Sequence, residues 1–209
     1  KRVDIPNMII TRVSDYIPGQ GQATAESLGI KDKGWHHFGE LLEATASHSR
    51  PRPTIKPEDP CVIQFTGGTT GAPKGATLTH ANIVAGIYEN MYWGGSVINP
   101  IPVERRKSFC VLPYYHIYGE VCQMCWSIKN AATQIILPRF EIEEVMDTIE
   151  KFDDISYFAA VPTMLNAIVN HPRAKQMDLG KKFVFVGCGG APCPQDLIDK
   201  LLDMDIFYQ

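Results

Sequence analysis

The chain has 209 residues, of which 44% are hydrophobic and 10% aromatic, so it can bury the core of one large or two small domains. Its formal net charge of -3 and its lack of a long Lys/Arg tract argue against a nucleic-acid partner. No apolar run approaches the roughly 20 residues that span a bilayer, and the first residues lack a signal-peptide core, so we expect a cytoplasmic globular protein.

The first 58 residues are expected to contain a strand, a loop, a helix and a linker. Residues 8–13 (MIITRV) have the composition of a strand, and residues 17–33 are rich in Gly, Gln and Pro, as loops are. Residues 35–46 carry apolar side chains at helical spacing. Residues 47–60 contain four prolines and almost no aliphatic side chains, which predicts an extended linker.

From Cys61 onward, segments typical of strands and helices alternate. The expected strands are 61–65, 75–80, 108–113, 133–138, 156–160 and 183–188, and the expected helices are 81–94, 119–129, 141–152, 162–170 and 194–204. Such alternation with apolar strands predicts an α/β fold, a mainly parallel sheet with helices on both faces. Ligands of these sheets bind at the carboxyl ends of the strands, where we expect loops 66–71, 113–119 and 187–194.

The first of these loops lies within QFTGGTTGAPKGATLTH, residues 64–80. Glycines let backbone N–H groups converge, and threonine hydroxyls and a lysine add donors, so the loop suits a polyphosphate. A flexible surface turn is the alternative. A Walker A loop is excluded because Pro73 precedes Lys74 and Gly75 follows it, and because the loop joins two strands. The candidate phosphate-binding residues are Thr66, Gly67, Gly68, Thr69, Thr70, Gly71, Lys74 and Gly75.

Six cysteines lie in apolar stretches, which favours reduced thiols over disulfides. Cys122 and Cys125 form a C-x-x-C pair, but the spacing of Cys188 and Cys193 does not fit the second half of a zinc site. On an apolar helix, residues three apart simply share a face. We therefore expect core packing at this pair and no metal site.

Four motifs together resemble the adenylate-forming superfamily, which includes acyl-CoA synthetases, adenylation domains and luciferases. They are TGGTTGAPKG followed by LTHANI, then LPYYHIYG, VPTMLNAI and GCGGAPCP. The resemblance is greatest to long- and medium-chain fatty-acid–CoA ligases. It implies that residues 59–209 are the AMP-binding α/β region and that residues 1–58 belong to the same large N-terminal domain.

The resemblance implies a two-step reaction. ATP and a fatty or other carboxylic acid form an acyl-adenylate and pyrophosphate, and the thiol of CoA then displaces AMP. ATP with Mg²⁺ and CoA are the implied co-substrates. The loop from Thr66 to Gly75 would hold the β- and γ-phosphates, with Lys74 adding mobile charge. Gly67 stands where the family often has Ser, so one hydroxyl donor is missing.

The resemblance places His116 beside the reacting carboxylate and the α-phosphate, where it would position the acyl group and donate toward developing charge. By residue type alone, a core histidine satisfied by a backbone carbonyl is the alternative. The glycine-rich turn would line the adenine pocket through Gly189, Gly190, Ala191 and Pro192, and it also serves as a strand-to-helix turn. The remaining histidines, His36, His37, His48, His80 and His171, are expected to be surface or packing residues.

We therefore expect an ATP-dependent acyl-CoA synthetase. The alternatives are an adenylation domain that loads a carrier protein, a non-catalytic nucleotide-binding module, and, less favoured, a kinase-type NTPase. Peripheral membrane contact stays open, and no short motif encodes acyl chain length or oligomeric state. Residues 86–95 (GIYENMYWGG) are a weak candidate for the lining of an acyl tunnel, because aromatic residues at helical spacing are usually core residues. The resemblance also implies that the next family motif and a small C-terminal lid domain would follow Gln209, so residues 1–209 alone are expected to be inactive.

Overall fold

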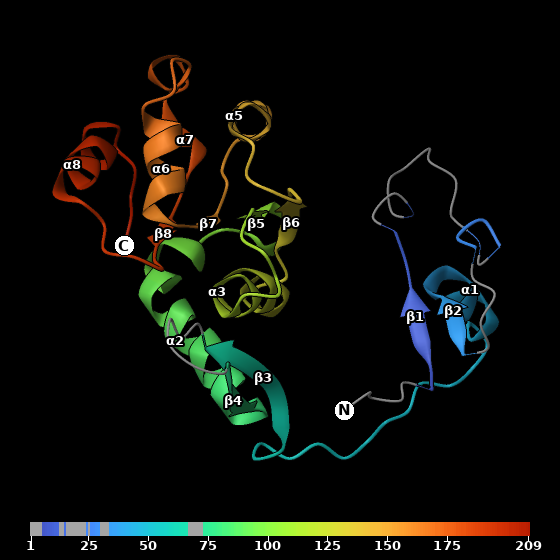
Figure 1. Cartoon of the computed structure of the whole chain (residues 1–209). Coiled ribbons are helices and arrows are strands. Elements are labelled where there is room, and N and C mark those ends of the chain that lie inside the picture. Colours follow the sequence, from blue (N-terminus) through green and yellow to red (C-terminus); the bar gives the residue numbers. More distant parts are fainter. Residues whose placement is uncertain (1–5, 13–14, 16–23, 25, 30–33, 67–72) are drawn as a thin grey trace. The chain divides into compact units, whose positions relative to one another are not determined.

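The computed structural model describes residues 6–12, 15, 24, 26–29, 34–66 and 73–209. The chain forms two compact units, residues 1–54 and residues 55–209 (Figure 1). No helix of the described residues is long and apolar enough to cross a bilayer.

In the first unit, the first three residues of the expected helix form a second short strand, which pairs with the first. Strand β1 (Met8–Ile10) lies parallel to β2 (Trp35–His37), and α1 (Phe38–Ala44) follows directly. The prediction of a helix from residue 35 is therefore wrong for its first three residues. His37 is held in extended conformation by this pairing, and its buried Nε2 lies 3.1 Å from Asp15 Oδ2. Tertiary pairing thus overrides the local helical spacing.

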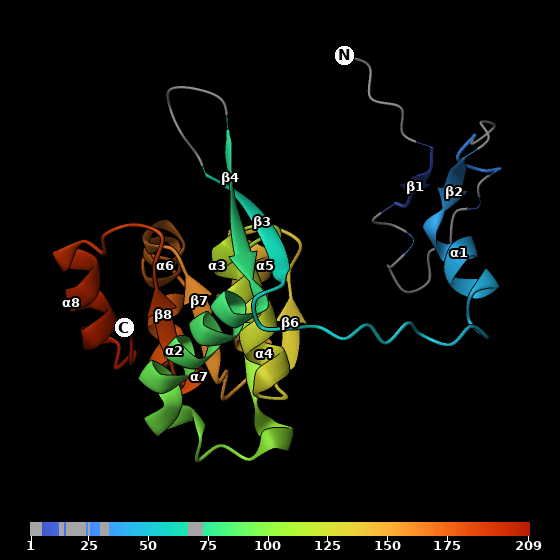
Figure 2. The same cartoon turned by 90° about the horizontal axis from the view of Figure 1, so that it is seen from below.

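The second unit begins with a two-stranded antiparallel ribbon that leads into a long helix (Figure 2). Strands β3 (Pro60–Thr66) and β4 (Lys74–Thr79) form the ribbon, and α2 (His80–Ile98) follows. Thr79 caps α2, because its Oγ1 accepts from Asn82 N at 3.2 Å while Asn82 Oδ1 accepts from Thr79 N at 3.0 Å. The helix runs four residues past the predicted end at 94, because Gly94 is buried against the ring of Phe185 rather than ending the helix.

A four-stranded parallel sheet forms the centre of this unit. Its strands are β5 (Lys107–Cys110), β6 (Thr133–Ile136), β7 (Tyr157–Ala160) and β8 (Val186–Cys188), in the order β6-β5-β7-β8. The last residues of the chain continue the sheet beside β8, where Val186 N donates to Phe207 O and Gln209 N donates to Val186 O, each at 2.9 Å.

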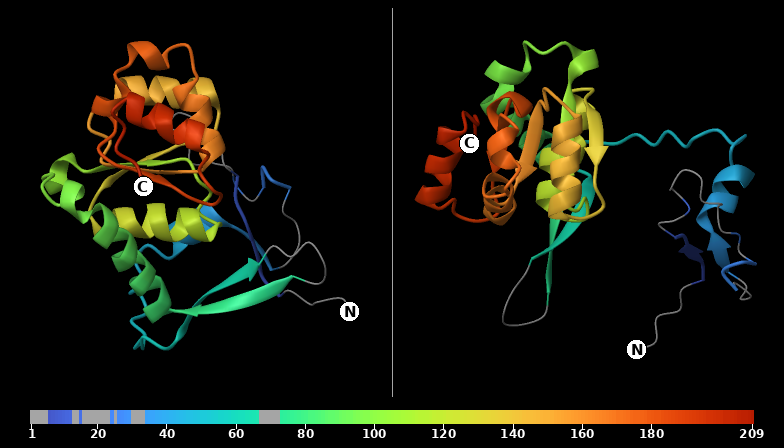
Figure 3. Two further views of the ribbon diagram at one scale, coloured as in Figure 1. Left: turned by 90° about the vertical axis from the view of Figure 1, so that its left-hand side faces the viewer. Right: turned by 90° about the horizontal axis from the view of Figure 1, so that it is seen from above.

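Helices cover both faces of the sheet (Figure 3). On one face lie α5 (Ile142–Lys151), α6 (Pro162–Val169), α7 (Leu179–Lys182) and α8 (Gln195–Asp203). On the other lie α2 and the continuous helical segment α3 (Ile117–Gly119), η3 (Glu120–Cys125) and α4 (Trp126–Lys129). Two 3₁₀ turns, η2 (Val103–Arg105) and η4 (Ala174–Gln176), complete the elements described here. The predicted α/β fold is confirmed.

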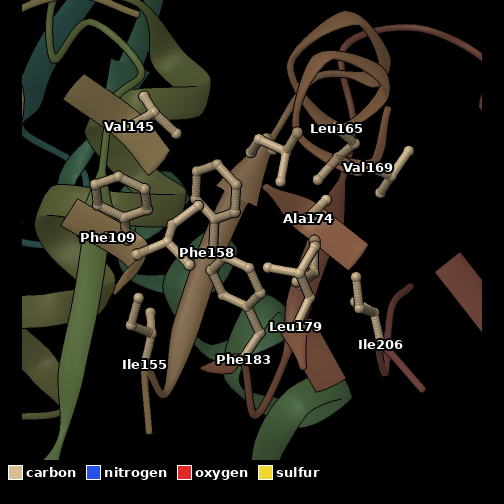
Figure 4. Packing of buried hydrophobic residues seen from close by; sticks show 14 of the residues in the cluster. Phe109, Val145, Ile155, Phe158, Leu165, Val169, Ala174, Leu179, Phe183 and Ile206 are labelled. Carbon is tan, nitrogen blue, oxygen red and sulfur yellow. The ribbon is translucent and has the colours of Figure 1, made fainter. Parts of the chain in front are cut away.

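The fully buried strand β7 shows how the sheet serves two cores. Phe158 and Ala160 point into the cluster beneath α5, α6 and α8, and Figure 4 shows Phe158 between Phe109 and Phe183. Tyr157 and Ala159 point the other way, into the cluster formed with α2 and α4. This alternation explains why the sequence of β7 is apolar throughout.

The two central strands, β5 and β7, part toward their carboxyl ends. They pair only at Ser108 with Tyr157 and at Phe109 with Phe158. Beyond that point β5 pairs with β6, and β7 pairs with β8. The chain leaves β5 toward β6 and leaves β7 toward β8, so the connections diverge here. Such a topological switch point is where open α/β sheets bind their ligands.

Candidate functional site

His116 lies in the loop that follows β5, at the switch point. It is the N-cap of α3, and its exposed side chain accepts a hydrogen bond at Nδ1 from Tyr118 N at 3.1 Å. With Nδ1 as the acceptor, the proton of the neutral imidazole is on Nε2, which can donate to a ligand. His116 is therefore not a core histidine, and its ring can reach solvent and bound molecules.

Tyr118 connects the His116 loop to the turn after β8. Its hydroxyl lies 3.2 Å from Gly187 O and 3.4 Å from Ala160 O, at the carboxyl ends of β8 and β7. Burial raises the pKa of Tyr118 well above its ordinary value, so the phenol stays protonated and can donate. A Cβ on Gly189 would lie 2.9 Å from the Tyr118 ring, so only glycine fits there without a shift.

The β8–α8 turn contains the four residues expected to line an adenine pocket. Gly189 N donates to Ala160 O at 3.0 Å, which holds the turn against β7. Gly190 has φ +79°, a left-handed conformation that favours glycine. Ala191 and Pro192 are exposed and available for contact with a flat ligand. The structure thus brings this turn and the His116 loop together through Tyr118.

Two adjoining cavities lie beside these loops. The smaller has a volume of about 270 Å³ and the larger about 520 Å³. Asn90, Trp93 and Tyr118 line both. The smaller cavity is also lined by Tyr157, Phe185, Gly187, Cys188, Gly189 and Gln209, and the larger by Leu78, Asn82, Ile83, Gly86, Glu89, Ile117, Val121 and Cys122.

Asn90 of α2 bridges the walls of both cavities. Its Nδ2 donates to Cys122 Sγ at 2.9 Å, and its Oδ1 accepts from the Tyr157 hydroxyl at 3.2 Å. Tyr118 was not among the predicted site residues, whereas Asn90 and Trp93 lie within residues 86–95, the suggested lining of an acyl tunnel. Tyr118 lies in the motif whose predicted site residue was His116. The segment around Asn90 was only a weak candidate, because aromatic residues at helical spacing are usually core residues.

Cys122 should react slowly with thiol reagents. Burial raises its pKa to about 11, so at pH 8 only about one thiol in a thousand is the reactive thiolate. Its alkylation by iodoacetamide should therefore accelerate as the pH rises toward 11. We expect peptide mass spectrometry at pH 8 to find exposed Cys61 labelled long before Cys122. Equal rates at the two cysteines would contradict this environment for Cys122.

The phosphate-loop candidates lie partly outside the described residues, namely Gly67, Gly68, Thr69, Thr70 and Gly71. Those on either side form the end of the β3–β4 ribbon, where Thr66 Oγ1 donates to Lys74 O at 3.3 Å. Gly75 has a packing role, because a Cβ there would lie 2.7 Å from Ile63 Cγ2. Gln64 Nε2 donates to Glu120 Oε2 at 2.9 Å, which ties the ribbon to the helical segment after His116.

The described residues contain no group of three His, Cys, Asp or Glu side chains placed to hold a metal ion. Cys122 and Cys125 are both partly buried on η3, and Cys122 packs against the cluster around Tyr157.

A parallel sheet whose loops gather at a topological switch point is the arrangement of open α/β ligand-binding domains. The chain belongs to the AMP-binding enzyme family, whose model matches residues 8–206.

Curated relatives include acid–CoA ligases. The chain is 31% identical over 184 residues to a long-chain-fatty-acid–CoA ligase of Bacillus subtilis (strain 168), covering 84% of this chain and 32% of the relative. It is 29% identical over 171 residues to 4-coumarate–CoA ligase 2 of Oryza sativa subsp. japonica, covering 78% and 28%. The chain thus spans about a third of the length of these relatives.

Solved structures of similar fold include the inhibitor-bound N-terminal domain of FACL13 from Mycobacterium tuberculosis. It has a TM-score of 0.63 and 25% identity, and the match covers 88% of this chain and 46% of that one. The o-succinylbenzoate CoA synthetase of Bacillus subtilis, in complex with its acyl-adenylate intermediate, has a TM-score of 0.68 at 21% identity, covering 89% and 36%. At that identity the second match shows the fold alone.

Proposed function

We propose that the full-length protein is an acid–CoA ligase that activates a carboxylic acid with ATP. The observation that carries this proposal is the meeting of the His116 loop and the Gly189–Pro192 turn at Tyr118, beside two adjoining cavities at the switch point. This arrangement places an exposed turn at Ala191 and Pro192, a donor on His116 and a largely apolar cavity within one region, which suits the adenylation of an acid.

ATP would bind with its adenine against the turn from Gly189 to Pro192 and its phosphates toward the β3–β4 connection. The backbone N–H groups and threonine hydroxyls of residues 66–75, with Lys74, would hold the β- and γ-phosphates, and Mg²⁺ would enter as the ATP complex. The Gln64–Glu120 bond supports this assignment, because it ties β3 to the helical segment that follows His116.

The acid would place its apolar part in the 520 Å³ cavity between α2 and η3, where Ile83 and Val121 supply apolar surface. Its carboxylate would attack the α-phosphorus of ATP, forming the acyl–O–P bond and releasing pyrophosphate. The CoA thiolate would then attack the acyl carbonyl carbon and release AMP. His116 Nε2–H would donate toward the acid or the α-phosphate and orient them, because a carboxylate needs no deprotonation near neutral pH.

An isotope-exchange assay between pyrophosphate and ATP, over a panel of fatty and aromatic acids, tests the proposal on the full-length protein. Acid-dependent exchange followed by CoA-dependent AMP release is the expected result. Acid-dependent exchange without CoA thioester formation would favour an adenylation domain that loads a carrier protein. ATP binding without acid-dependent exchange would indicate a non-catalytic module, and release of ADP would indicate a kinase-type enzyme.

Replacing Thr69 and Thr70 together by Ala in the full-length protein should lower the rate of ATP-dependent exchange by about 100-fold or more, because each preorganised donor contributes strongly to a developing charge. The melting temperature should not change. Thr77→Ala, at an exposed threonine of β4, is the matched control and should keep the wild-type rate. Unchanged kinetics in the double variant would mean that this loop is only a turn.

A further inference from the structure

Gln123 is a fully buried polar residue on η3, with 0% of its surface exposed. Its side-chain amide makes three hydrogen bonds, two to strands and one to the segment that follows β5. Nε2 donates to Phe109 O at 3.1 Å and to Ala159 O at 2.9 Å, while Oε1 accepts from Leu112 N at 3.2 Å. All of its amide bonds thus go to main-chain groups of β5, of β7 and of the segment after β5.

These three hydrogen bonds lie where β5 and β7 stop pairing with each other. The strands pair directly as far as Phe109 and Phe158, and one residue further the Ala159 carbonyl bonds to Gln123 instead of to β5. The amide of Gln123 therefore takes the place of the missing strand-to-strand bonds. It satisfies main-chain groups that would otherwise be buried without partners.

The same bonds connect the two loops of the candidate site. Leu112 lies four residues before His116, so the bond from Leu112 N fixes the start of the His116 loop. Ala159 immediately precedes Ala160, whose carbonyl meets the Tyr118 hydroxyl and Gly189 N. A displacement of Gln123 would therefore alter the spacing between the His116 loop and the Gly189 turn.

We propose that Gln123 is a positioning residue, which sets the distance between the acid-orienting loop and the nucleotide-binding turn by joining β5 to β7 at the switch point. This proposal rests on the proposed function, and in it Gln123 acts through the two loops and does not touch the substrates. A buried amide that served stability alone would lower the amount of folded protein when replaced. A positioning residue would also lower the rate of the protein that remains folded.

Three variants of the full-length protein separate these roles. Gln123→Met keeps the length of the side chain and removes all three bonds. Gln123→Glu keeps the shape and the acceptor, but its ionised form faces two carbonyl oxygens and cannot donate to them. Ser127→Ala is the control. Ser127 is equally buried on the next turn, and its hydroxyl donates to the helix carbonyl of Gln123 at 2.5 Å and also interacts with the Cys110 side chain, so its loss leaves the three bonds of the Gln123 amide in place.

We expect Gln123→Met to lower kcat for acid-dependent pyrophosphate exchange roughly 10- to 100-fold per folded molecule, because small misplacements of reacting groups are costly, with little change in KM for ATP. Deuterium uptake by residues 111–119 should increase. In Gln123→Glu, activity relative to wild type should rise as the pH falls from 8 to 6, since a buried carboxyl facing carbonyls is protonated more easily and can then donate. Ser127→Ala should match wild type in all three measurements.

The inference is overturned if deuterium uptake in Gln123→Met stays at the wild-type level, if its kcat per folded molecule is normal, or if Gln123→Glu follows the wild-type pH profile. Failure of the proposed function has a different signature, namely a wild-type protein without acid-dependent exchange. In that case, higher deuterium uptake at residues 111–119 in Gln123→Met would still show that Gln123 holds the His116 loop. Unchanged uptake would show that Gln123 does not hold this loop either.

Discussion

Replacing Phe158 by Ala should lower the free energy of unfolding by about 3–5 kcal/mol, the range for truncating a fully buried aromatic side chain. Phe158 has 0% of its surface exposed and lies in the middle of the central strand β7. Its ring centroid is 5.0 Å from that of Phe109 and 5.6 Å from that of Phe183 (Figure 4). A cavity at this position would leave the β5–β7 pair without its shared packing.

Urea denaturation followed by circular dichroism measures this change. Tyr115→Ala is the control, because that side chain is 86% exposed and its loss should change the free energy of unfolding by less than about 0.5 kcal/mol. Equal stability of the Phe158→Ala and Tyr115→Ala variants would mean that the core is not arranged as described.

Replacing His116 by Ala should slow adenylate formation by about 100-fold while leaving most of the stability intact. The ring is exposed, and its one bond in the described structure is the N-cap bond from Tyr118 N, whose loss costs about 1 kcal/mol. The rate should fall much more, because the donor at Nε2 and the orientation of the acid are both lost. A thermal melt and a pyrophosphate-exchange assay on the same sample measure the two effects.

His116→Asn separates capping from chemistry. Asparagine is a good N-cap residue, so this variant should recover the stability lost in His116→Ala. Its shorter side chain does not place a donor where Nε2 of histidine lies, so its exchange rate should stay low. If His116→Asn restores both stability and rate, His116 acts only as the cap of α3 and its assignment to the site is wrong.

Local patterns were enough to predict most of the second unit. Helices α5 and α8 and strands β5 and β7 lie within a few residues of their predicted ranges. Each keeps one burial pattern from end to end, amphipathic in the helices and apolar in the strands, so the sequence pattern marks its length. The predictions failed where distant contacts decide the conformation. Trp35–His37 forms a strand because it pairs with β1. The paired residues Met8 and Trp35 are 27 positions apart in the sequence.

The same difference between local patterns and distant contacts explains why only part of the candidate site was predicted. The strand-end rule correctly brought the loops after β5 and β8 to the same edge of the sheet. The residues that join these loops were not predicted, because Tyr118 meets Gly187 across 69 positions and Tyr157 meets Asn90 across 67. Gln123 offered a weak signal as a polar residue within an apolar run, and only the structure shows that its partners are main-chain groups of the strands.

The π-helical turn η3 limits how the length of this region can change. A π-helix closes hydrogen bonds from i to i+5, so η3 accommodates more residues in a turn than the α-helical segments α3 and α4 beside it. Deleting one residue of this turn, such as Met124, would therefore let a regular α-helix form with α3 and α4 in nearly the same relative orientation, because a π-helical turn holds about one residue more than an α-helical turn. Trp126 would still face Tyr157, where their ring centroids are 4.5 Å apart, whereas the side chains inside the turn, Gln123 among them, would change direction. A single-residue deletion in η3 should therefore preserve the packing of α4 but lose the strand contacts of Gln123, whereas the same deletion within the regular helix α2 would rotate every residue after it by roughly 100°.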